Sequence, residues 1–280
     1  MNRFTGKVVL VTGSSNGIGR ATGLVFAQEG AKVTITGRNS DRLEETRQEI
    51  LKAGVPENKV LAVVADLATE AGQDDIIDST VKTFGRLDVL VNNAGAAFND
   101  SQGRTGVSQD VEVYDRIMQI NLRSVVTLTQ KAKPYLIEAK GEIINVSSIG
   151  GGPQAQPTFM YYAMTKSALD QFTRSVAIDL IPYGVRVNSV SPGPVKTGFG
   201  AAMGMDDEMM RKYERFLESH KSCIPRGTIG NPVEIAHIIA FLADRRISSH
   251  IIGQSIVADG GSSLIMGMQA LDFSEIQKAR

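Results

Sequence analysis

The chain of 280 residues is 42% hydrophobic and 21% charged, which is enough apolar material for one large α/β domain spanning residues 1–280. Thirty Lys and Arg residues balance thirty Asp and Glu residues, and no long basic run predicts a nucleic-acid partner. The longest apolar-looking run, Ile235 to Ala243, falls well short of the roughly 20 residues that a membrane span requires. The composition therefore excludes a membrane-spanning or nucleic-acid-binding protein as the first hypothesis.

The single cysteine, Cys223, cannot form a disulfide within the chain. The first residues contain no apolar stretch resembling a signal peptide, and the last residues differ from the Ser-Lys-Leu peroxisomal address. We therefore expect a cytoplasmic protein. His220, His237 and His250 lack the spacing of metal ligands, so we expect no metal site.

Short β-branched runs alternate with segments of helical spacing along the chain. The runs are mostly apolar and seldom alternate strictly, as is typical of parallel strands that helices cover on both faces. Repeated βαβ units predict a single-domain, doubly wound, Rossmann-type parallel sheet of about seven strands, with its ligand beyond the carboxyl ends of the strands. The predicted strands are Lys7–Val11, Lys32–Thr36, Val60–Ala65, Asp88–Asn92, Glu142–Ser147, Val185–Val190 and Gln254–Ala258.

Two stretches interrupt this alternation. Residues 96–109 are polar and contain glycine, which predicts a surface loop. Residues 198–222 contain four methionines and lie where a lid over a substrate would lie; plain core packing is the alternative role of these methionines. Asn231-Pro232-Val233-Glu234 predicts the start of a further helix, with an N-cap and a proline at the first helical position.

A glycine-rich turn, Thr12-Gly13-Ser14-Ser15-Asn16-Gly17-Ile18-Gly19, lies between the first predicted strand and an apolar helix. Glycines there permit positive φ and let the backbone approach a pyrophosphate at the helix N-terminus. The spacing differs from the GxGxxG fingerprint, so a tight turn without a ligand is the alternative interpretation of this motif alone.

Four motifs follow one another in the order found in short-chain dehydrogenases/reductases: the glycine turn, Asn92-Asn93-Ala94-Gly95, Tyr162-x-x-x-Lys166 and Pro192-Gly193. The chain resembles this family from Gly6 to about Gly261. The resemblance implies NADP or NAD in an extended pose. The implied cofactor-binding residues are Gly13, Ser15, Asn16, Gly17, Ile18 and Gly19 at the pyrophosphate, Asp66 and Leu67 near the adenine, Asn93, Ala94 and Gly95 along the adenosine ribose, Tyr162 and Lys166, and Pro192, Gly193, Val195 and Thr197 at the nicotinamide.

Structural roles remain open for two of these groups. Asp66 has the position of an acid at a helix start, and this role competes with contact to adenine. The Asn92–Gly95 segment has the residue types of strand-end capping and a turn.

Tyr162 and Lys166 lie four residues apart, so on a helix both side chains share one face. Nearby positive charge lowers the pKa of a phenol from its ordinary value near 10, which makes Tyr162 a proton donor and acceptor. The neighbouring Tyr161 has the uncharged Thr165 at the same spacing. An ordinary surface pair is the alternative for Tyr162 and Lys166 when the glycine turn is ignored.

The resemblance also implies a serine that binds the reacting oxygen, and Ser148 matches the motif. Ser147 competes with it because the interval from Ser148 to Tyr162 is one residue longer than we expect from close relatives. Asn121 matches the family's helix asparagine, which holds a water joining Lys166 to solvent. The alternative for Asn121 is a hydrogen-bonded polar residue at a helix kink.

The end of the second strand, Gly37-Arg38, favours NADP over NAD. An NAD enzyme usually has an acid there, which binds the ribose 2′-hydroxyl. Gly37 removes that charge, and the guanidinium of Arg38 can bind a 2′-phosphate with two hydrogen bonds. The alternative is that Asp41 binds the ribose, although its position suits the first turn of a helix.

The sequence thus predicts an NADP-dependent oxidoreductase that transfers a hydride between nicotinamide and a carbonyl or alcohol carbon of a small apolar substrate. The alternatives are an enoyl reductase of the same family and a non-catalytic dinucleotide-binding subunit. The presence of Tyr162 and Lys166 argues against the non-catalytic subunit. The resemblance further implies a homo-oligomer, either a tetramer or a dimer.

Overall fold

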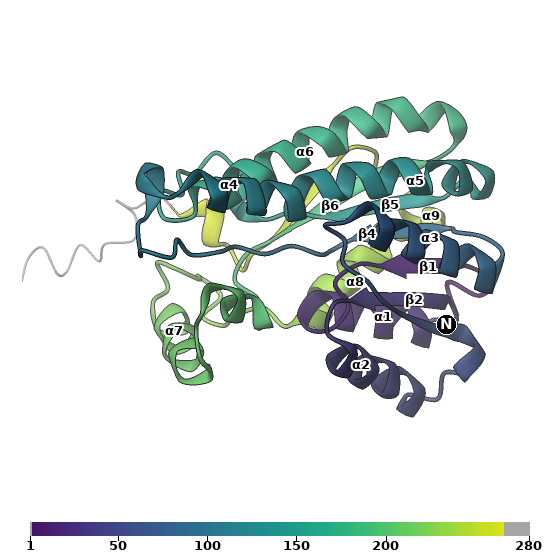
Figure 1. Ribbon diagram of the computed structural model, residues 1–280, viewed down its shortest axis with the longest axis horizontal. Helices are drawn as coiled ribbons and strands as arrows, with labels where there is room; N and C mark the ends of the chain where they lie inside the picture. The colour runs from purple at the N-terminus through teal and green to yellow at the C-terminus, as the bar shows by residue number, and fades with distance from the viewer. Residues whose placement is uncertain (1, 266–280) are drawn as a thin grey trace, which may run out of the picture.

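The computed structural model describes residues 2–265, which form a seven-stranded sheet between two layers of helices (Figure 1). The strand order is β3-β2-β1-β4-β5-β6-β7, and every neighbouring pair is parallel. The predicted doubly wound sheet and all seven predicted strands are confirmed. The strands are β1 (Val8–Val11), β2 (Lys32–Gly37), β3 (Val60–Val64), β4 (Val89–Asn92), β5 (Glu142–Val146), β6 (Arg186–Pro192) and β7 (Ser255–Ala258).

The apolar runs are buried because helices cover both faces of the sheet. Every residue of β1, β4, β5 and β6 is buried, whereas the edge strands β3 and β7 are partly exposed. Lower in Figure 1, one face packs against α1 (Gly17–Gln28), α2 (Ser40–Lys52) and α8 (Pro232–Ala243). The other face packs against α3 (Glu70–Phe84), α5 (Ser124–Ala139) and α6 (Met160–Leu180).

The remaining α-helices of residues 2–265 are α4 (Val111–Met118), α7 (Asp207–Ser219) and α9 (Arg245–Ser248). Helix α4 contacts α6. The predicted helix start at Asn231 is confirmed. The Asn231 side chain accepts from the amide of Val233, and the Glu234 carboxylate accepts from the amide of Asn231, so the two residues form a capping box.

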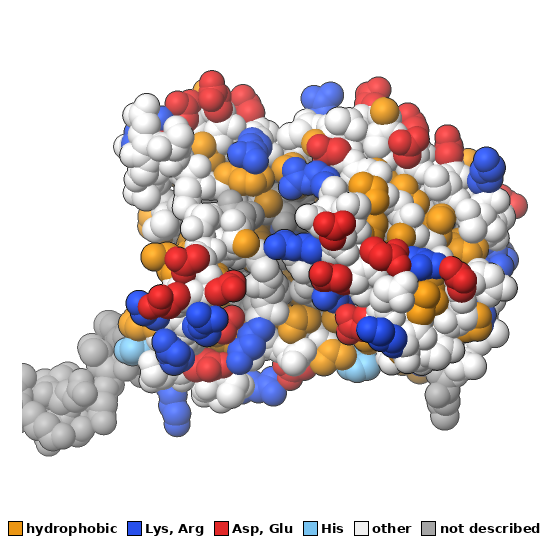
Figure 2. All heavy atoms as spheres, turned by 60° about the horizontal axis from the view of Figure 1, so that its bottom comes forward, with side chains coloured by type: hydrophobic (Ala, Val, Ile, Leu, Met, Phe, Trp, Pro, Cys, Tyr) orange, Lys and Arg blue, Asp and Glu red, His pale blue; other side chains and the backbone are white. Residues whose placement is uncertain are grey.

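All seven strands are parallel, so their carboxyl ends lie along one side of the sheet. The glycine turn, the loop after β4 and the segment with α7 leave the sheet on this side, at the left of Figure 1. No helix within residues 2–265 is long and apolar enough to cross a membrane. Acidic and basic side chains are interspersed over the described face in Figure 2 and form no continuous basic surface there.

Candidate active site

The glycine turn has the conformation that a close approach by a phosphate requires. Gly13 and Gly17 have φ of 66° and 53°, in the left-handed region. A Cβ atom at Gly19 would overlap the carbonyl oxygen of Gly13, so a side chain there would disrupt the turn. The Nδ2 atom of Asn93 donates to the carbonyls of Thr12 (2.8 Å) and Gly13 (3.1 Å). Asn93 therefore fixes the shape of the turn from the end of β4.

The Asn92–Gly95 segment caps the end of β4 with hydrogen bonds, as its residue types permit. The Thr12 hydroxyl accepts from the amides of Asn93 and Ala94, each at 3.0 Å. Asn92 donates to the side chain of Asn145 on β5 at 2.9 Å. These bonds join β1, β4 and β5 directly below the place where the resemblance puts the cofactor.

The end of β2 packs closely against the glycine turn. A Cβ atom at Gly37 would overlap the hydroxyl oxygen of Ser15, so Ser15 would have to rotate before any larger residue could stand there. Arg38 is exposed and has no ion pair within residues 2–265, whereas Arg20 and Arg47 nearby pair with acids of α2. The guanidinium of Arg38 is therefore available to an anionic ligand.

Two acids considered at the sequence level fill structural positions. Asp41 lies in the first turn of α2, which is the position that the sequence favoured. Asp66 is exposed, and its carboxylate accepts from the amide of Ala68 at 2.9 Å, shortly before α3. Leu67 packs against the core and its carbonyl accepts from Gln73. Asp66 thus forms a turn before α3, and the N-cap of that helix is Thr69. The contact of Asp66 with adenine stays a prediction.

Tyr162 lies in the first turn of α6, and Ser148 follows β5. Burial raises the pKa of Tyr162 to about 12, and a hydrogen bond with Ser148 opposes this rise. The hydroxyl of Ser148 also accepts from the amide of Gly150 at 3.1 Å. The Ser147 hydroxyl instead donates to the carbonyl of Lys166 at 3.3 Å and is buried. Of the two serines, Ser148 is the one placed at the phenol.

Lys166 is buried beside Tyr162. Its ammonium donates to the carbonyl of Val146 at 2.8 Å and lies 5.6 Å from the centre of the Tyr162 ring. Burial lowers the pKa of Lys166 to about 8, against the opposing influence of Asp170. Burial thus raises the pKa of the phenol and lowers that of the ammonium. The lowered phenol pKa expected from Lys166 together with an oxidised nicotinamide stays a prediction.

Asn121 is fully buried in a π-helical turn, Gln119–Arg123, between α4 and α5. Its side chain accepts from the amide of Ala96 (2.8 Å) and donates to the carbonyl of Ala96 (2.9 Å) and to Thr165 (3.2 Å). A Cβ atom at Gly95 would lie 3.3 Å from Asn121 Oδ1 and 3.4 Å from Lys166 Nζ. The structure therefore brings Asn121 and Lys166 together around Gly95, and π turns are frequent at functional sites.

The segment after β6, which contains Pro192, Gly193, Val195 and Thr197, approaches the glycine turn. Thr197 lies so close to Gly17 that a Cβ atom on this glycine would be 2.9 Å from the Thr197 Cβ. Asn16 similarly faces Gly198, and Val195 pairs with Gly230 in a short parallel bridge. The loops after β1 and β6 thus lie against each other at the carboxyl ends of the strands.

The segment 198–222 forms a 3₁₀ helix, Gly198–Met203, followed by α7. The ring of Phe199 meets the ring of Tyr162 edge to face at 5.4 Å. The sulfur of Met210 is packed against Gly200, with the sulfur of Met205 close by. The sequence predicted a lid here but not the contact of Phe199 with Tyr162. No spacing along the chain identifies the partner of an aromatic side chain.

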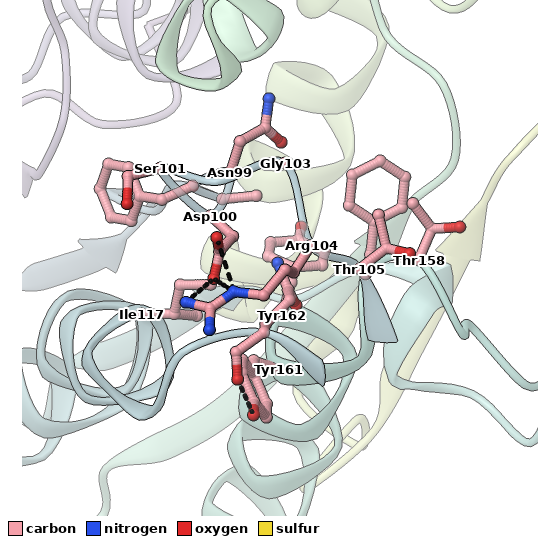
Figure 3. A pocket seen from close by; sticks show the side chains of 14 residues that line it. Asn99, Asp100, Ser101, Gly103, Arg104, Thr105, Ile117, Thr158, Tyr161 and Tyr162 are labelled. Carbon is pink, nitrogen blue, oxygen red and sulfur yellow. Dashed lines mark hydrogen bonds and ion pairs between the residues drawn. The ribbon is translucent and has the colours of Figure 1, made fainter. Parts of the chain in front are cut away.

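A cavity of about 410 Å³ lies beside Tyr162 and is walled by the loop after β4 (Figure 3). Phe98, Ile117 and Phe159 give it an apolar side, and Asn99, Ser101, Thr105 and Thr158 give it hydrogen-bonding groups. The expectation of a plain surface loop at residues 96–109 misses this role. The signal that could have found it is the position of the loop, directly after the Asn92–Gly95 motif.

No group of three His, Cys, Asp or Glu side chains that could hold a metal ion occurs within residues 2–265. Cys223 is half-buried against Leu217, Ile224 and Ile229, so its surroundings are those of a packing residue.

The doubly wound sheet, the glycine turn and the paired Tyr162 and Lys166 together define an α/β oxidoreductase that binds a nicotinamide dinucleotide. A protein-family profile described as enoyl-(acyl carrier protein) reductase matches residues 13–263. The chain belongs to the short-chain dehydrogenase/reductase family, whose members use NAD or NADP and act on carbonyl or alcohol substrates.

Solved structures and a curated relative agree with this assignment. A short-chain dehydrogenase/reductase of unknown function from Caenorhabditis elegans, solved with cofactor, is 62% identical with a TM-score of 0.95, over 96% of this chain and 100% of that chain. A glucose dehydrogenase of Caenorhabditis elegans is 54% identical with a TM-score of 0.82, over 94% and 100%. The 3-oxoacyl-[acyl-carrier-protein] reductase of Thermotoga maritima is 36% identical over 92% of this chain and 98% of its own.

Proposed function

We propose that the protein is an NADP-dependent reductase of small carbonyl compounds, with Tyr162 as the proton donor. The observation that carries this proposal is the meeting of Ser148, Tyr162 and Lys166 beside a cavity on the same side of the sheet as the glycine turn. A bound nicotinamide would supply the hydride in reduction or accept it in oxidation. The residues of the chain then have to bind the carbonyl oxygen, donate a proton and hold the cofactor.

The pKa values suit the reductive direction. A phenol with a pKa of about 12 is protonated at neutral pH, which is the form that donates a proton to a developing alkoxide. Ser148 lies beside the phenol and would orient the carbonyl oxygen with a second hydrogen bond. Lys166 and Asn121, gathered around Gly95, would position the cofactor ribose and return a proton to Tyr162 from solvent.

The preference for NADP rests on Gly37, Ser15 and Arg38. The Ser15 hydroxyl fills the space where an acid at position 37 would extend, so the 2′-hydroxyl partner of NAD enzymes is missing. The exposed Arg38 offers a planar guanidinium to a 2′-phosphate, with no ion pair in residues 2–265 to compete for it.

The substrate would lie in the cavity of about 410 Å³, under a lid formed by residues 198–222. Phe98, Ile117 and Phe159 suit the apolar part of a small molecule, and the polar side chains that also line the cavity suit hydroxyl or oxo groups. The glucose dehydrogenase among the similar structures acts, by its name, on a molecule with many hydroxyl groups. We therefore extend the expected substrate from purely apolar compounds to compounds with both kinds of surface.

The test is NADPH oxidation by the purified protein with a panel of aldehydes, cyclic ketones, ethyl acetoacetate, aldose sugars and crotonyl-CoA. Tyr162→Phe should lower kcat by roughly 100- to 10,000-fold because it removes the proton donor and keeps the ring. Binding of NADPH, followed by the fluorescence of the nicotinamide because the chain has no tryptophan, should stay near the wild-type value. Tyr183→Phe, an exposed position at the far end of α6, is the matched control and should retain wild-type turnover.

Two results would overturn the proposal. Near-normal turnover by Tyr162→Phe would remove the assigned proton donor. Turnover of crotonyl-CoA in preference to every carbonyl probe would support enoyl reduction, which the description of the matching family profile names.

A further inference from the structure

The loop after β4 contains a carboxylate that is more completely buried than a surface loop requires. The side chain of Asp100 has no exposed surface, although Ser101 and Gln102 beside it are exposed. A buried carboxylate is stable only when hydrogen bonds and a countercharge replace its hydration. The partners of Asp100 therefore indicate what its burial achieves.

Every partner of Asp100 comes from the loop that it starts. One oxygen accepts from the amide of Gln102 at 2.8 Å, and the other accepts from the amide of Asp110 at 2.7 Å. The Nε atom of Arg104 lies 3.1 Å from both oxygens. The bonds from Arg104 and the two amides hold the pKa of Asp100 well below its ordinary value of 3.8.

This arrangement closes residues 100–110 into a loop whose two ends meet at one carboxylate. Arg104 also pairs with Asp110 at 2.9 Å, and Asp110 caps α4. Asp100, Arg104 and Tyr162 are all among the residues that line the cavity in Figure 3. The shape of this cavity wall thus depends on Asp100.

The wall also touches the elements that face it. Asn99, next to Asp100, donates to the carbonyl of Met203 at 2.6 Å in the segment before α7. At the other end of the loop, the hydroxyl of Tyr161 donates to the carbonyl of Gln109 at 3.3 Å. The loop therefore joins α6 to the lid segment across the mouth of the cavity.

We propose that Asp100 is a positioning residue for substrate binding: its carboxylate folds residues 100–110 into the cavity wall and so determines substrate affinity, without taking part in proton or hydride transfer. The inference rests on the proposed function, since it takes this cavity as the substrate site. The hydrogen bonds of Asp100 go to Gln102, Arg104 and Asp110 and reach neither the glycine turn nor Tyr162. Replacing Asp100 should therefore raise KM for the substrate and leave kcat and KM for NADPH unchanged.

The test is Asp100→Asn, which keeps the size of the side chain. The new NH₂ group faces a backbone N–H group, and Arg104 loses the negative charge with which it pairs. KM for the best carbonyl probe of the panel should rise about 10-fold, while kcat and KM for NADPH stay within about twofold. The reason is that the loop would bind the substrate equally in the ground state and the transition state, so its loss weakens binding without slowing the chemical step. Amide hydrogen exchange in residues 100–110 of the NADPH-bound protein should become roughly 10-fold faster. Arg104→Lys, which keeps the charge and loses the planar fork, should give an intermediate KM.

Asp115→Asn is the matched control: it removes the same charge from an exposed residue of α4, and both KM and exchange should match the wild type. Unchanged exchange in Asp100→Asn would show that the carboxylate does not hold the loop. Faster exchange with an unchanged KM would show that the loop is no part of the substrate site. A fall in kcat together with weaker NADPH binding would indicate general damage and would also overturn the positioning role. If instead Tyr162→Phe retains turnover, the proposed function fails, and the exchange result still decides whether Asp100 holds the loop.

Discussion

Replacing Lys166 by Met is expected to stabilise the folded protein while it abolishes turnover. Lys166 is 3% exposed, and its ammonium has one hydrogen-bond acceptor within residues 2–265, the carbonyl of Val146. An ammonium in such a place has lost most of its hydration. Met has nearly the same length and no charge, so it fills the same space without this penalty.

The magnitude follows from the pKa of Lys166. Its ordinary value is 10.5, and burial lowers it to about 8. At about 1.36 kcal/mol per pH unit, this difference corresponds to roughly 3 kcal/mol of folding free energy at pH 7. Loss of the hydrogen bond to Val146 offsets about 1 kcal/mol. We expect a net gain of roughly 2 kcal/mol, or about 4 °C in Tm for a protein of this size.

The dependence on pH has a definite sign. Below about pH 8 Lys166 is charged in both the folded and the unfolded state, so the full cost of burying its charge lowers the free energy of unfolding. Between about pH 8 and 10.5 the folded state binds fewer protons than the unfolded state, and the stability of the wild type rises with pH. The advantage of Lys166→Met should therefore be largest at neutral pH and fall to zero at about pH 10, where the remaining penalty equals the lost hydrogen bond.

The assay is thermal unfolding of the ligand-free protein from pH 7 to 10, with Lys52→Met as the control. Lys52 is exposed in the last turn of α2, so its replacement should leave Tm nearly unchanged at every pH. A Tm below that of the wild type at pH 7, or a gain that does not change with pH, would refute the reasoning. Turnover should be lost in either case.

Two further predictions concern other parts of the molecule. Arg38→Asp should lower the ratio of kcat/KM for NADPH to kcat/KM for NADH by roughly 10- to 100-fold. Lys52→Asp is the control and should leave this ratio unchanged. An unchanged ratio in Arg38→Asp would contradict the NADP preference. Glu142→Gln should destabilise the fold by about 3 kcal/mol, because it removes the carboxylate that lies 2.9 Å from the buried guanidinium of Arg186 and leaves that charge with neutral hydrogen-bond acceptors. Glu208→Gln breaks an exposed pair, and thermal unfolding should show a loss below about 1 kcal/mol.

The sequence predicted the sheet well because burial on both faces gives each strand a continuous apolar run. Predicted and observed bounds differ by one or two residues, for example Val185–Val190 against Arg186–Pro192. These differences occur at strand ends, where the last backbone hydrogen bonds and not the side-chain pattern decide the boundary.

The motifs located the site but could not show whether the pKa values of its side chains are raised or lowered. The spacing of Tyr162 and Lys166 predicts that they share a helix face, and the structure places them together. The sequence shows no burial, so it could not show that the same desolvation raises the pKa of the phenol and lowers that of the ammonium. The choice between Ser147 and Ser148 likewise depended on which hydroxyl leaves the core, which only the path of the chain after β5 determines.

The loop after β4 shows why the cavity wall escaped sequence analysis. Asp100, Arg104 and Asp110 have the composition of a solvated loop, and charged residues at such spacings are usually exposed. Their order along the chain contains no periodicity, because the loop is shaped by bonds to one carboxylate and by no repeating backbone pattern. Side-chain bonds of this kind leave no trace in hydrophobic spacing. The residues expected to bind the cofactor follow a pattern tied to the backbone. The residues that line the proposed substrate cavity follow only the contacts that form after folding, so substrate specificity has to be derived from the structure.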